Sequence, residues 1–497
     1  MTNGSASSLA SAKAATGIAG LDDVLGGGLA RARLHLIEGA PGTGKTTIAL
    51  QFLMEGARLG ERCLYVALSE SETELRDGAA SHGWSLSDNI AIYELTPPES
   101  LLDADQQQSL LYSSDLELGE TTKRIFEVFE RVNPSRVVLD SLSEIRLLAQ
   151  SSLRYRRQIL ALKHYFSRHA ASVVLLDDLT SEVNDQAIHS IAHGVIRLDQ
   201  LTLTYGAERR QLRVMKFRGQ PFRGGLHDFT IKTGGVQVFP RLVASEQRRT
   251  FARDQLGSGI RELDALLGGG LERGSSSLLI GPAGGGKSLM TLQFIVAATG
   301  RGEKAALFVF DEELGLLIDR AKPLGIDLQR LRDEGKLHVE QVDAAEQSPG
   351  EFAHKVRAMV EQQDIRTVVI DSLNGYHAAM PQEQHLLLHM HELLQYLNRQ
   401  GATTFLTVAQ HGLVESGRAP IDVSYLADTV LLIRYFELLG HIRRAISVVK
   451  KRAGAHETTI RELVLSSRGI QIGPVLENLR GVLQGMPTLA GGPDTSP

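Results

Sequence analysis

The chain has 497 residues, of which 42% are hydrophobic and 22% charged, a composition typical of a globular protein with several domains. Its formal net charge of −5 argues against sequence-independent binding of nucleic acid. Cys63 is the single cysteine, which excludes an intramolecular disulfide and a cysteine-based zinc site. No apolar run is long enough to span a bilayer and no signal peptide is recognisable, so we expect a cytoplasmic protein without a membrane segment.

A phosphate loop follows the first residues of the chain. Residues 1–15 are rich in serine and alanine, and we expect a disordered tail there. The apolar run Leu34–Ile37 predicts a strand, and residues 47–53 predict the first turns of a helix. Between them, the sequence GAPGTGKT from Gly39 to Thr46 fits the phosphate-loop pattern. Its glycines allow backbone N–H groups to face a phosphate at the N-terminus of a helix.

The same stretch occurs a second time. TGIAGLDDVLGGGL before the first loop returns from residue 258 as SGIRELDALLGGGL, and the alignment continues without a gap through a second loop, GPAGGGKS. Position for position, Gly39 falls on Gly281, Lys45 on Lys287 and Thr46 on Ser288. The protein is therefore a tandem duplication of units of roughly 240 residues, a length typical of an α/β domain. Both lysines are expected to reach the outer phosphates of ATP.

Strands and helices are expected to alternate in each unit, which predicts an α/β fold with a mostly parallel sheet. Later strands are predicted at 136–139, 172–176, 367–370 and 403–408, and antiparallel strands at 211–215 and 445–449. We expect a tail at 1–15, a first domain at 16–243, a linker at 244–257, a second domain at 258–475, and a C-terminal loop and tail at 476–497.

An aspartate ends one apolar strand in each unit. Asp140 follows residues 137–139, and Asp371 follows residues 368–370. A carboxylate at a strand end beside a phosphate loop holds Mg²⁺ together with the hydroxyl of the loop. The predicted metal ligands are Thr46 and Asp140 in the first unit and Ser288 and Asp371 in the second.

Nucleotide hydrolysis also needs a group that orients or deprotonates water. The strand after each phosphate-loop helix ends in acidic residues, Glu70 in the first unit and Asp311 and Glu312 in the second. Carboxylates at that edge of a parallel sheet would point toward the γ-phosphate. Solvated loop acids are the alternative interpretation.

Together these features resemble the KaiC family, the ATPases and autokinases of the circadian clock, within the RecA-like ATPases. The resemblance covers residues 16–490 and rests on the duplication, the GGGL stretches, both loops, both strand-end aspartates and a Lys-x-Arg element near the end of each unit. It implies two tandem RecA-like P-loop ATPase domains in a homohexamer of two stacked rings, with ATP and Mg²⁺ at subunit interfaces. The first ring would hydrolyse ATP slowly, and the second would phosphorylate its own serine and threonine. A KaiB-like regulatory protein would be a partner.

The resemblance also implies individual nucleotide contacts. In the first unit these are Gly42, Thr43, Gly44, Lys45, Thr46, Thr47, Ser81, Lys216, Phe217 and Arg218. In the second unit they are Gly284, Gly285, Gly286, Lys287, Ser288, Leu289, Arg444, Lys450, Lys451, Arg452 and His456. The Lys-x-Arg elements are expected to reach the nucleotide of a neighbouring subunit, where a fixed cation stabilises the transferring phosphoryl group.

The chain departs from the family at several catalytic positions. The family's paired glutamates fall on Ser69-Glu70 and Asp311-Glu312, which puts hydrolysis in the first ring in doubt. The family's Ser-Thr phosphorylation pair falls on Ser424-Tyr425, which leaves Ser424 as the expected phosphoacceptor. A structural serine before a strand is the alternative. The segment 478–488 resembles the family's C-terminal regulatory loop.

The leading hypothesis is therefore an ATP-hydrolysing autokinase that serves as a signalling or clock-type timer. A RecA-like recombinase or helicase shares the fold and the loops, although the acidic net charge and the lack of a DNA-binding module argue against it. A nucleotide-switched scaffold with an inactive first ring is the third possibility.

Overall fold

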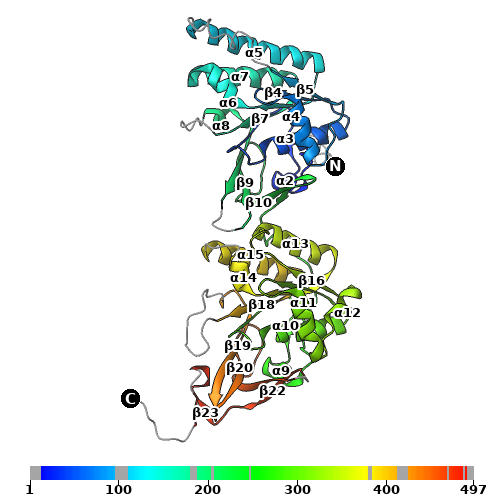
Figure 1. Cartoon of the computed structure of the whole chain (residues 1–497), viewed down its shortest axis with the longest axis vertical. Coiled ribbons are helices and arrows are strands. Elements are labelled where there is room, and N and C mark those ends of the chain that lie inside the picture. Colours follow the sequence, from blue (N-terminus) through cyan, green and yellow to red (C-terminus); the bar gives the residue numbers. More distant parts are fainter. Residues whose placement is uncertain are drawn as a thin grey trace, which may run out of the picture. The chain divides into compact units, whose positions relative to one another are not determined.

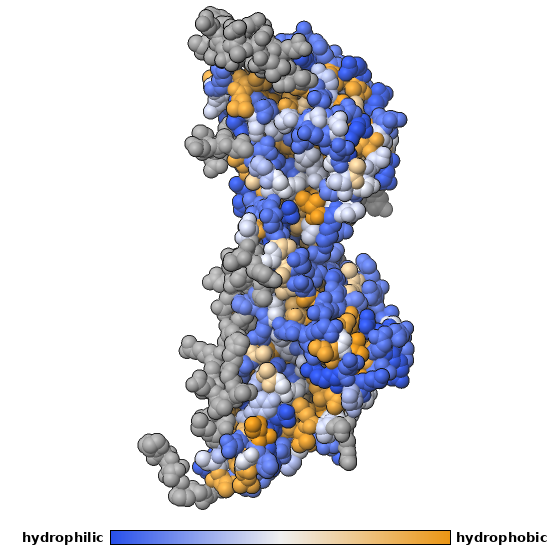
Figure 2. All heavy atoms as spheres, in the orientation of Figure 1, coloured by the Kyte–Doolittle hydropathy of each residue, from blue (hydrophilic) through white to orange (hydrophobic). Residues whose placement is uncertain are grey.

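The computed structural model describes residues 13–95, 110–179, 187–202, 206–245, 248–378, 383–410, 424–466, 469–484 and 487–489. The chain divides into two compact units, unit 1 with Met1–Arg241 and unit 2 with Leu242–Pro497 (Figure 1). Most of the visible surface of the described residues is hydrophilic, with scattered apolar patches (Figure 2).

Unit 1 contains the following elements in chain order: β1 (Lys13–Ala14), α2 (Ala19–Val24), β2 (Leu29–Ala30), β3 (Leu34–Gly39), α3 (Lys45–Arg58), β4 (Cys63–Ala67), α4 (Glu72–Ser81), β5 (Ile90–Glu94), α5 (Leu110–Val132), β6 (Arg136–Asp140), α6 (Leu142–Ala149), α7 (Ser152–Arg168), β7 (Ser172–Asp177), α8 (Ala187–Ile191), β8 (Gly194–Leu201), β9 (Arg209–Phe217), β10 (His227–Lys232) and β11 (Gly235–Phe239).

Unit 2 contains β12 (Gln255–Leu256), α9 (Arg261–Leu266), β13 (Leu271–Glu272), β14 (Ser276–Gly281), α10 (Lys287–Gly300), β15 (Lys304–Val309), α11 (Leu314–Ala321), η3 (Lys322–Leu324), α12 (Leu328–Asp333), β16 (Leu337–Gln341), α13 (Pro349–Gln362), β17 (Ile365–Asp371), α14 (Leu373–Ala378), α15 (Glu383–Gln400), β18 (Thr403–Ala409), β19 (Thr429–Leu438), β20 (His441–Lys451), β21 (Arg461–Ser466), β22 (Gly469–Val475), β23 (Leu479–Arg480), η4 (Val482–Gln484) and β24 (Thr488–Leu489).

One large sheet forms the centre of each unit. Within the described residues, the strand order is β11-β10-β9-β8-β3-β7-β6-β4-β5 in unit 1 and β16-β15-β17-β18-β14-β19-β20-β21-β22 in unit 2. The strands from β8 to β5 and from β16 to β19 run parallel, and the remaining strands are antiparallel. The predicted α/β fold with mostly parallel central sheets is confirmed. The parallel strands begin at what we term the amino edge and end at the carboxyl edge.

Helices cover both faces of each sheet because the parallel strands are apolar on both sides. In unit 1, α2, α3 and α4 pack on one face through residues such as Leu21, Leu53 and Leu75. The opposite face is covered by α5, α6 and α7 through residues such as Phe129 and Ile159. Unit 2 repeats this arrangement, with α9 to α12 on one face and α13 to α15 on the other.

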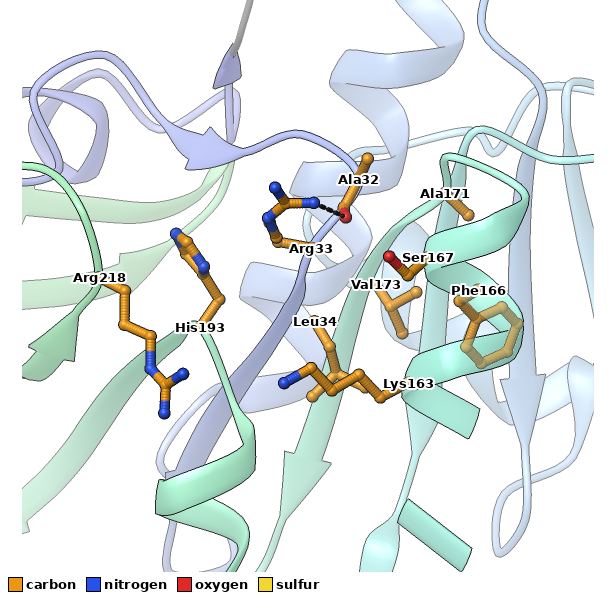
Figure 3. Close-up of a pocket in the computed structure, with 10 residues that line it drawn as sticks. All are labelled: Ala32, Arg33, Leu34, Lys163, Phe166, Ser167, Ala171, Val173, His193 and Arg218. Atoms are coloured by element: carbon orange, nitrogen blue, oxygen red, sulfur yellow. Dashed lines mark hydrogen bonds between the residues drawn. The ribbon is translucent and has the colours of Figure 1, made fainter. Parts of the chain in front are cut away.

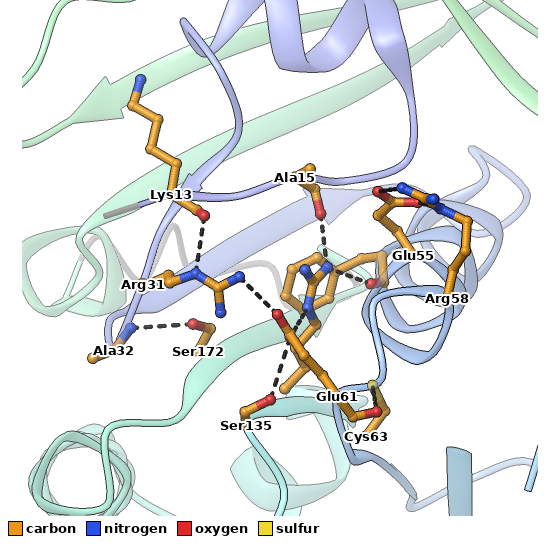
Figure 4. Close-up of polar contacts among 12 residues, drawn as sticks. Lys13, Ala15, Arg31, Ala32, Glu55, Arg58, Glu61, Cys63, Ser135 and Ser172 are labelled. Atoms are coloured by element: carbon orange, nitrogen blue, oxygen red, sulfur yellow. Dashed lines mark hydrogen bonds and ion pairs between the residues drawn. The ribbon is translucent and has the colours of Figure 1, made fainter. Parts of the chain in front are cut away.

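The predicted disordered tail is wrong at its C-terminal end. Lys13 and Ala14 form β1, which pairs with β2, and the main-chain oxygen of Ala15 accepts a 2.7 Å hydrogen bond from Arg136. Arg136 is completely buried and also contacts Glu61, with Nε 2.6 Å from Oε2. Figure 4 labels Ala15 and Glu61, the partners in these two contacts. Residues 1–12 lie outside the described residues.

The other predicted boundary segments also contain ordered contacts. Ala244, in the predicted linker, is buried in the core of unit 2, and its N–H donates to Glu392 at 3.1 Å. In the predicted C-terminal loop, Val482 is buried against Phe436 and Ala445. Residues 485–486 and 490–497 of that segment lie outside the described residues.

Candidate functional site in two phosphate loops

The phosphate loop of unit 1 joins β3 to α3 at the carboxyl edge. Gly44 has a φ of +98°, which glycine adopts without strain and which allows α3 to begin at Lys45. A Cβ atom at Gly44 would lie 2.5 Å from Cδ1 of Ile231. Nζ of Lys45 donates to the carbonyls of Gly39 at 2.9 Å and Ala40 at 3.0 Å. The lysine is therefore folded over the loop, where the phosphates of a nucleotide would lie.

The predicted metal ligands of unit 1 are in contact. Oγ1 of Thr46 donates a 3.2 Å hydrogen bond to Oδ2 of Asp140, and the hydroxyl of Tyr65 donates to the same oxygen. Burial raises the pKa of Asp140 in spite of these two hydrogen bonds. A bound cation would favour the charged carboxylate. Because both ligands provide oxygen, which Mg²⁺ prefers, the pair fits that ion.

A cavity of about 340 Å³ adjoins this pair, and Thr46, Thr47, Glu70 and Ser81 are among its lining residues. Burial raises the pKa of Glu70, and repulsion by Asp140 adds to the shift. The structure thus brings the candidate water-orienting carboxylate, the candidate metal ligands and the predicted nucleotide contact Ser81 to one place.

Asp178 is a further charged residue of this site that the sequence analysis missed. Its Oδ1 lies 2.8 Å from Nζ of Lys45. Although burial alone would raise the pKa of Asp178, the hydrogen bond and the charge of Lys45 hold that pKa below its ordinary value. The signal was present in the sequence because Asp178 follows an apolar strand, as Asp140 does.

The phosphate loop of unit 2 has the same backbone and no acid at the position of Asp178. Gly286 has a φ of +106°, and Nζ of Lys287 donates to the carbonyls of Gly281 at 2.9 Å and Pro282 at 2.8 Å. The sheet register places Ala409 beside Gly281, where unit 1 has Asp178. Burial lowers the pKa of Lys287, and the charge of Asp371 partly offsets this shift. Among the described residues, Lys287 forms no ion pair.

The three acids after β15 have different roles. Oγ of Ser372 donates to Oδ2 of Asp311, which holds Asp311 beside the end of β17. Glu312 forms a 2.9 Å ion pair with Arg320 of α11. Glu313 caps α11 by accepting two main-chain hydrogen bonds. The geometry therefore favours Asp311 over Glu312 as a base near the nucleotide.

The Lys-x-Arg elements lie at the amino edge, remote from the loops of their own units. Lys216 pairs with Val195 near the start of β8, and Lys450 pairs with Val430 near the start of β19. The neighbouring parallel strands β3 and β14 extend from this edge to the phosphate loops at the other. Neither element reaches the loop of its own unit.

Two of the predicted nucleotide contacts have side chains committed to their own unit. Phe217 is buried, and its ring stacks on His35 at 5.5 Å between centroids. Nζ of Lys451 donates to the carbonyl of Leu267 at 2.7 Å and lies 3.1 Å from a carboxylate oxygen of Glu272. These contacts hold both side chains within their own unit, and their nucleotide contacts stay predictions.

Arg444 and His456 lie at opposite edges of unit 2. The guanidinium carbon of Arg444 lies 5.4 Å from the ring centroid of Tyr435, whose hydroxyl donates to the carbonyl of Ala283 in the phosphate loop. Arg444 is therefore close to the loop of its own unit. His456 follows the far end of β20, in the segment that passes Gly268.

The predicted phosphoacceptor Ser424 lies in a turn before β19, at the amino edge. Its main-chain carbonyl accepts a 2.9 Å hydrogen bond from Nζ of Lys450. The parallel strand β14 separates this edge from the loop of unit 2, a distance of roughly 15–20 Å. Ser424 is thus beyond reach of the loop in its own unit.

In the part of the chain that the structure describes, no helix is both long and apolar enough to cross a membrane.

Comparisons with known proteins give one consistent family. Residues 14–243 and 256–477 match the family model described as "ATPase: KaiC". The circadian clock oscillator protein KaiC of Thermostichus vulcanus is 28% identical over 488 residues, which cover 96% of this chain and 92% of that protein. The circadian clock protein KaiC3 of Synechocystis sp. (strain PCC 6803) is 27% identical over 485 residues, covering 96% and 94%. The KaiC of Prochlorococcus marinus (strain MIT 9313) is 28% identical over 487 residues, covering 96% and 95%.

Proposed function

Because this chain belongs to the KaiC family of RecA-like ATPases, we propose that it hydrolyses ATP and that its second unit is a serine/threonine autokinase. The membership confirms the family predicted from the sequence and the tandem pair of nucleotide-binding units. The names of these relatives place them in circadian clocks. For this chain we propose a signalling or clock-type timer.

One observation carries the proposed mechanism: the acceptor and the phosphate loop of unit 2 lie at opposite edges of the same sheet. Ser424 and Arg452 are at the amino edge, and Lys287 is at the carboxyl edge. Phosphoryl transfer needs the acceptor oxygen roughly 3 Å from the phosphorus. Transfer must therefore pass between copies, which supports the proposed homohexamer with ATP at its subunit interfaces.

The residues of unit 2 have distinct roles in this transfer. Lys287 would contact the outer phosphates. Ser288 and Asp371 would hold Mg²⁺ through their side-chain oxygens, and the ion would supply positive charge that offsets the charge of the phosphates. The hydroxyl oxygen of Ser424 from a second copy forms a bond to the γ-phosphorus while the bond to the β–γ bridging oxygen breaks. Asp311 accepts the hydroxyl proton, and ADP leaves.

Unit 1 is proposed to hydrolyse ATP slowly, with Glu70 as the group that orients water. The ion pair between Lys45 and Asp178 favours slow turnover, because a phosphate must compete with the carboxylate for the lysine. The same pair also supports the second candidate, a nucleotide-switched scaffold in which unit 1 binds ATP without turnover.

A KaiB-like regulatory partner is a further proposal from family membership.

Incubation with γ-labelled ATP and Mg²⁺, followed by mapping of the labelled residue, tests the autokinase. We expect label on Ser424, with none in Ser424→Ala and none in Lys287→Ala. Lys45→Ala is the matched control, because it alters the equivalent lysine of unit 1 and should retain labelling in assembled protein. Label that persists in both Ser424→Ala and Lys287→Ala would overturn the proposal.

A further inference from the structure

Each of the two predicted metal-ligating aspartates has a hydroxyl donor on a neighbouring strand. In unit 1 the donor is Tyr65 of β4, whose hydroxyl lies 2.5 Å from Oδ2 of Asp140. In unit 2 the donor is Thr407 of β18, whose Oγ1 donates to Oδ1 of Asp371. Both donors are completely buried. The aspartates are equivalent in the duplication but their donors are not, because β4 and β18 flank the aspartate strands from opposite sides.

The sheet register shows an exchange of residues between the two flanking strands. Tyr65 pairs with the residue two places before Asp140, and the residue at this register in unit 2 is Leu307. Thr407 lies beside the strand that leads to the phosphate loop, and the residue at this register in unit 1 is Leu176. Both leucines are buried. Each unit therefore has one hydroxyl and one leucine at the two flanking positions, in opposite order.

The hydrogen bonds fix how each carboxylate is turned. The terminal torsion of an aspartate side chain has broad minima, so a carboxylate without partners rotates readily. Thr46 and Tyr65 both donate to Oδ2 of Asp140, and within the described residues no hydrogen bond reaches its Oδ1. Thr407 donates to Oδ1 of Asp371, whose Oδ2 accepts no hydrogen bond from the residues that the structure describes. Each aspartate thus has one oxygen fixed and one oxygen available.

Packing alone does not account for this arrangement. A buried tyrosine needs a partner for its hydroxyl, which by itself would explain the contact of Tyr65. It would not explain why unit 2, which has Leu307 at this position, has Thr407 on the other side of the equivalent aspartate. The two units share the hydrogen bond to the carboxylate and not the residue that forms it.

We propose that Tyr65 and Thr407 are equivalent positioning residues, each of which holds the aspartate of its own unit in the orientation that binds Mg²⁺. The proposal rests on the nucleotide binding proposed above, because the ion binds together with the phosphates. Groups that hydrogen-bond a metal ligand orient it in advance, and their loss typically weakens metal binding by about 10- to 100-fold. Unit 1 should therefore depend on Tyr65, and unit 2 on Thr407, for the coupling between Mg²⁺ and nucleotide.

Binding of a fluorescent ADP analogue to the full chain, in Mg²⁺ and in EDTA, tests this role. The ratio of the two dissociation constants measures the coupling between ion and nucleotide. Lys287→Ala restricts binding to unit 1, and in this background Tyr65→Phe removes only the hydroxyl. The matched control is Tyr155→Phe, which removes the hydroxyl of another buried tyrosine of unit 1, one that accepts a 3.4 Å hydrogen bond from Arg146. Before the analogue is added, the fluorescence of Trp84, the single tryptophan, reports whether these variants are folded.

We expect Tyr65→Phe to lower the coupling ratio about tenfold and to leave the constant in EDTA unchanged. Tyr155→Phe should change neither constant. Adding Leu176→Thr to Tyr65→Phe introduces the hydroxyl at the position that unit 2 uses, and it should recover most of the lost ratio. In a Lys45→Ala background, Thr407→Val should lower the ratio of unit 2 by a similar factor, which tests the proposal independently of Tyr65→Phe.

An unchanged ratio in either Tyr65→Phe or Thr407→Val would overturn the proposal. An equal loss in Tyr155→Phe, or a ratio close to one in the units that retain their hydroxyls, would also overturn it. Absence of binding both in Mg²⁺ and in EDTA would contradict the nucleotide site itself. Failure of the proposed function is therefore distinguishable from failure of the positioning role alone, in which the analogue still binds.

Discussion

The two phosphate loops share a backbone but differ in the charges around their lysines. In unit 1, Lys45 is paired with Asp178, and the equivalent position beside the loop of unit 2 is Ala409. At the amino edge the difference is reversed, because Arg452 of unit 2 is paired with Asp428 while Arg218 of unit 1 has no acidic partner in the described residues. The duplication has therefore kept the fold and redistributed the charges between the two units.

The largest expected effect is on the stability of unit 1. Arg136→Ala leaves Glu61 without its buried partner and removes the hydrogen bond to Ala15, so we expect a loss of about 3–5 kcal/mol in the free energy of unfolding. Urea denaturation followed by the fluorescence of Trp84 measures unit 1 selectively. Thr367→Ala, at the equivalent position in unit 2, is the control and should leave that transition unchanged. If Arg136→Ala lowered the free energy of unfolding by less than about 1 kcal/mol, the contacts of Arg136 with Glu61 and Ala15 would not be a main source of stability for unit 1.

The next effect separates the two candidate bases of unit 2. Asp311→Asn should lower the rate of Ser424 labelling by about 10²- to 10⁴-fold, because it removes the proton acceptor. Glu312→Gln should change the rate by less than about threefold, because Glu312 is paired with Arg320. Single-turnover labelling gives both rates. A larger loss in Glu312→Gln than in Asp311→Asn would reverse the assignment.

A smaller effect is expected from exchanging the residue beside each loop lysine. Asp178→Ala removes a carboxylate that competes with phosphate for Lys45, and we expect about tenfold tighter binding of ATP to unit 1. The reciprocal change Ala409→Asp should weaken binding to unit 2 by a similar factor. Titration with a fluorescent ATP analogue, with the other loop inactivated by a lysine-to-alanine change, measures each unit. Weaker binding in Asp178→Ala would mean that the carboxylate helps to hold the nucleotide.

The smallest effect is a change in the pH profile of unit 1. Burial raises the pKa of Glu70, and only the deprotonated carboxylate can accept a proton from water. ATP hydrolysis by unit 1 should therefore fall as the pH decreases through this raised pKa, and the residual activity of Glu70→Gln should lose that dependence. Phosphate release between about pH 5 and 8, measured in Lys287→Ala, gives the profile. An unchanged acid limb in Glu70→Gln would exclude this role.

The sequence predicted the candidate metal ligands correctly as neighbours, because their positions depend on where the strands end. Thr46 and Asp140 meet because the phosphate loop and the end of β6 lie at the same edge of a parallel sheet, and this geometry follows from the strand pattern. The apolar strand before Asp178 also places this residue at that edge, but its ion pair with Lys45 depends on the direction of the two side chains, which the pattern of apolar residues does not specify. Arg33, Lys163 and Arg218 come from separate segments of unit 1 and line one hollow (Figure 3), which no local motif could reveal.

Transfer between copies is the central claim, and a mixing experiment tests it most directly. Ser424→Ala retains a complete catalytic loop without an acceptor, and Asp311→Asn retains the acceptor without its base. Each variant alone should incorporate almost no label from γ-labelled ATP. We predict that mixed and reassembled protein recovers labelling, with the phosphate located on Ser424 of the Asp311→Asn chain. Absence of label in the mixture, with both variants folded and co-assembled, would contradict transfer between copies.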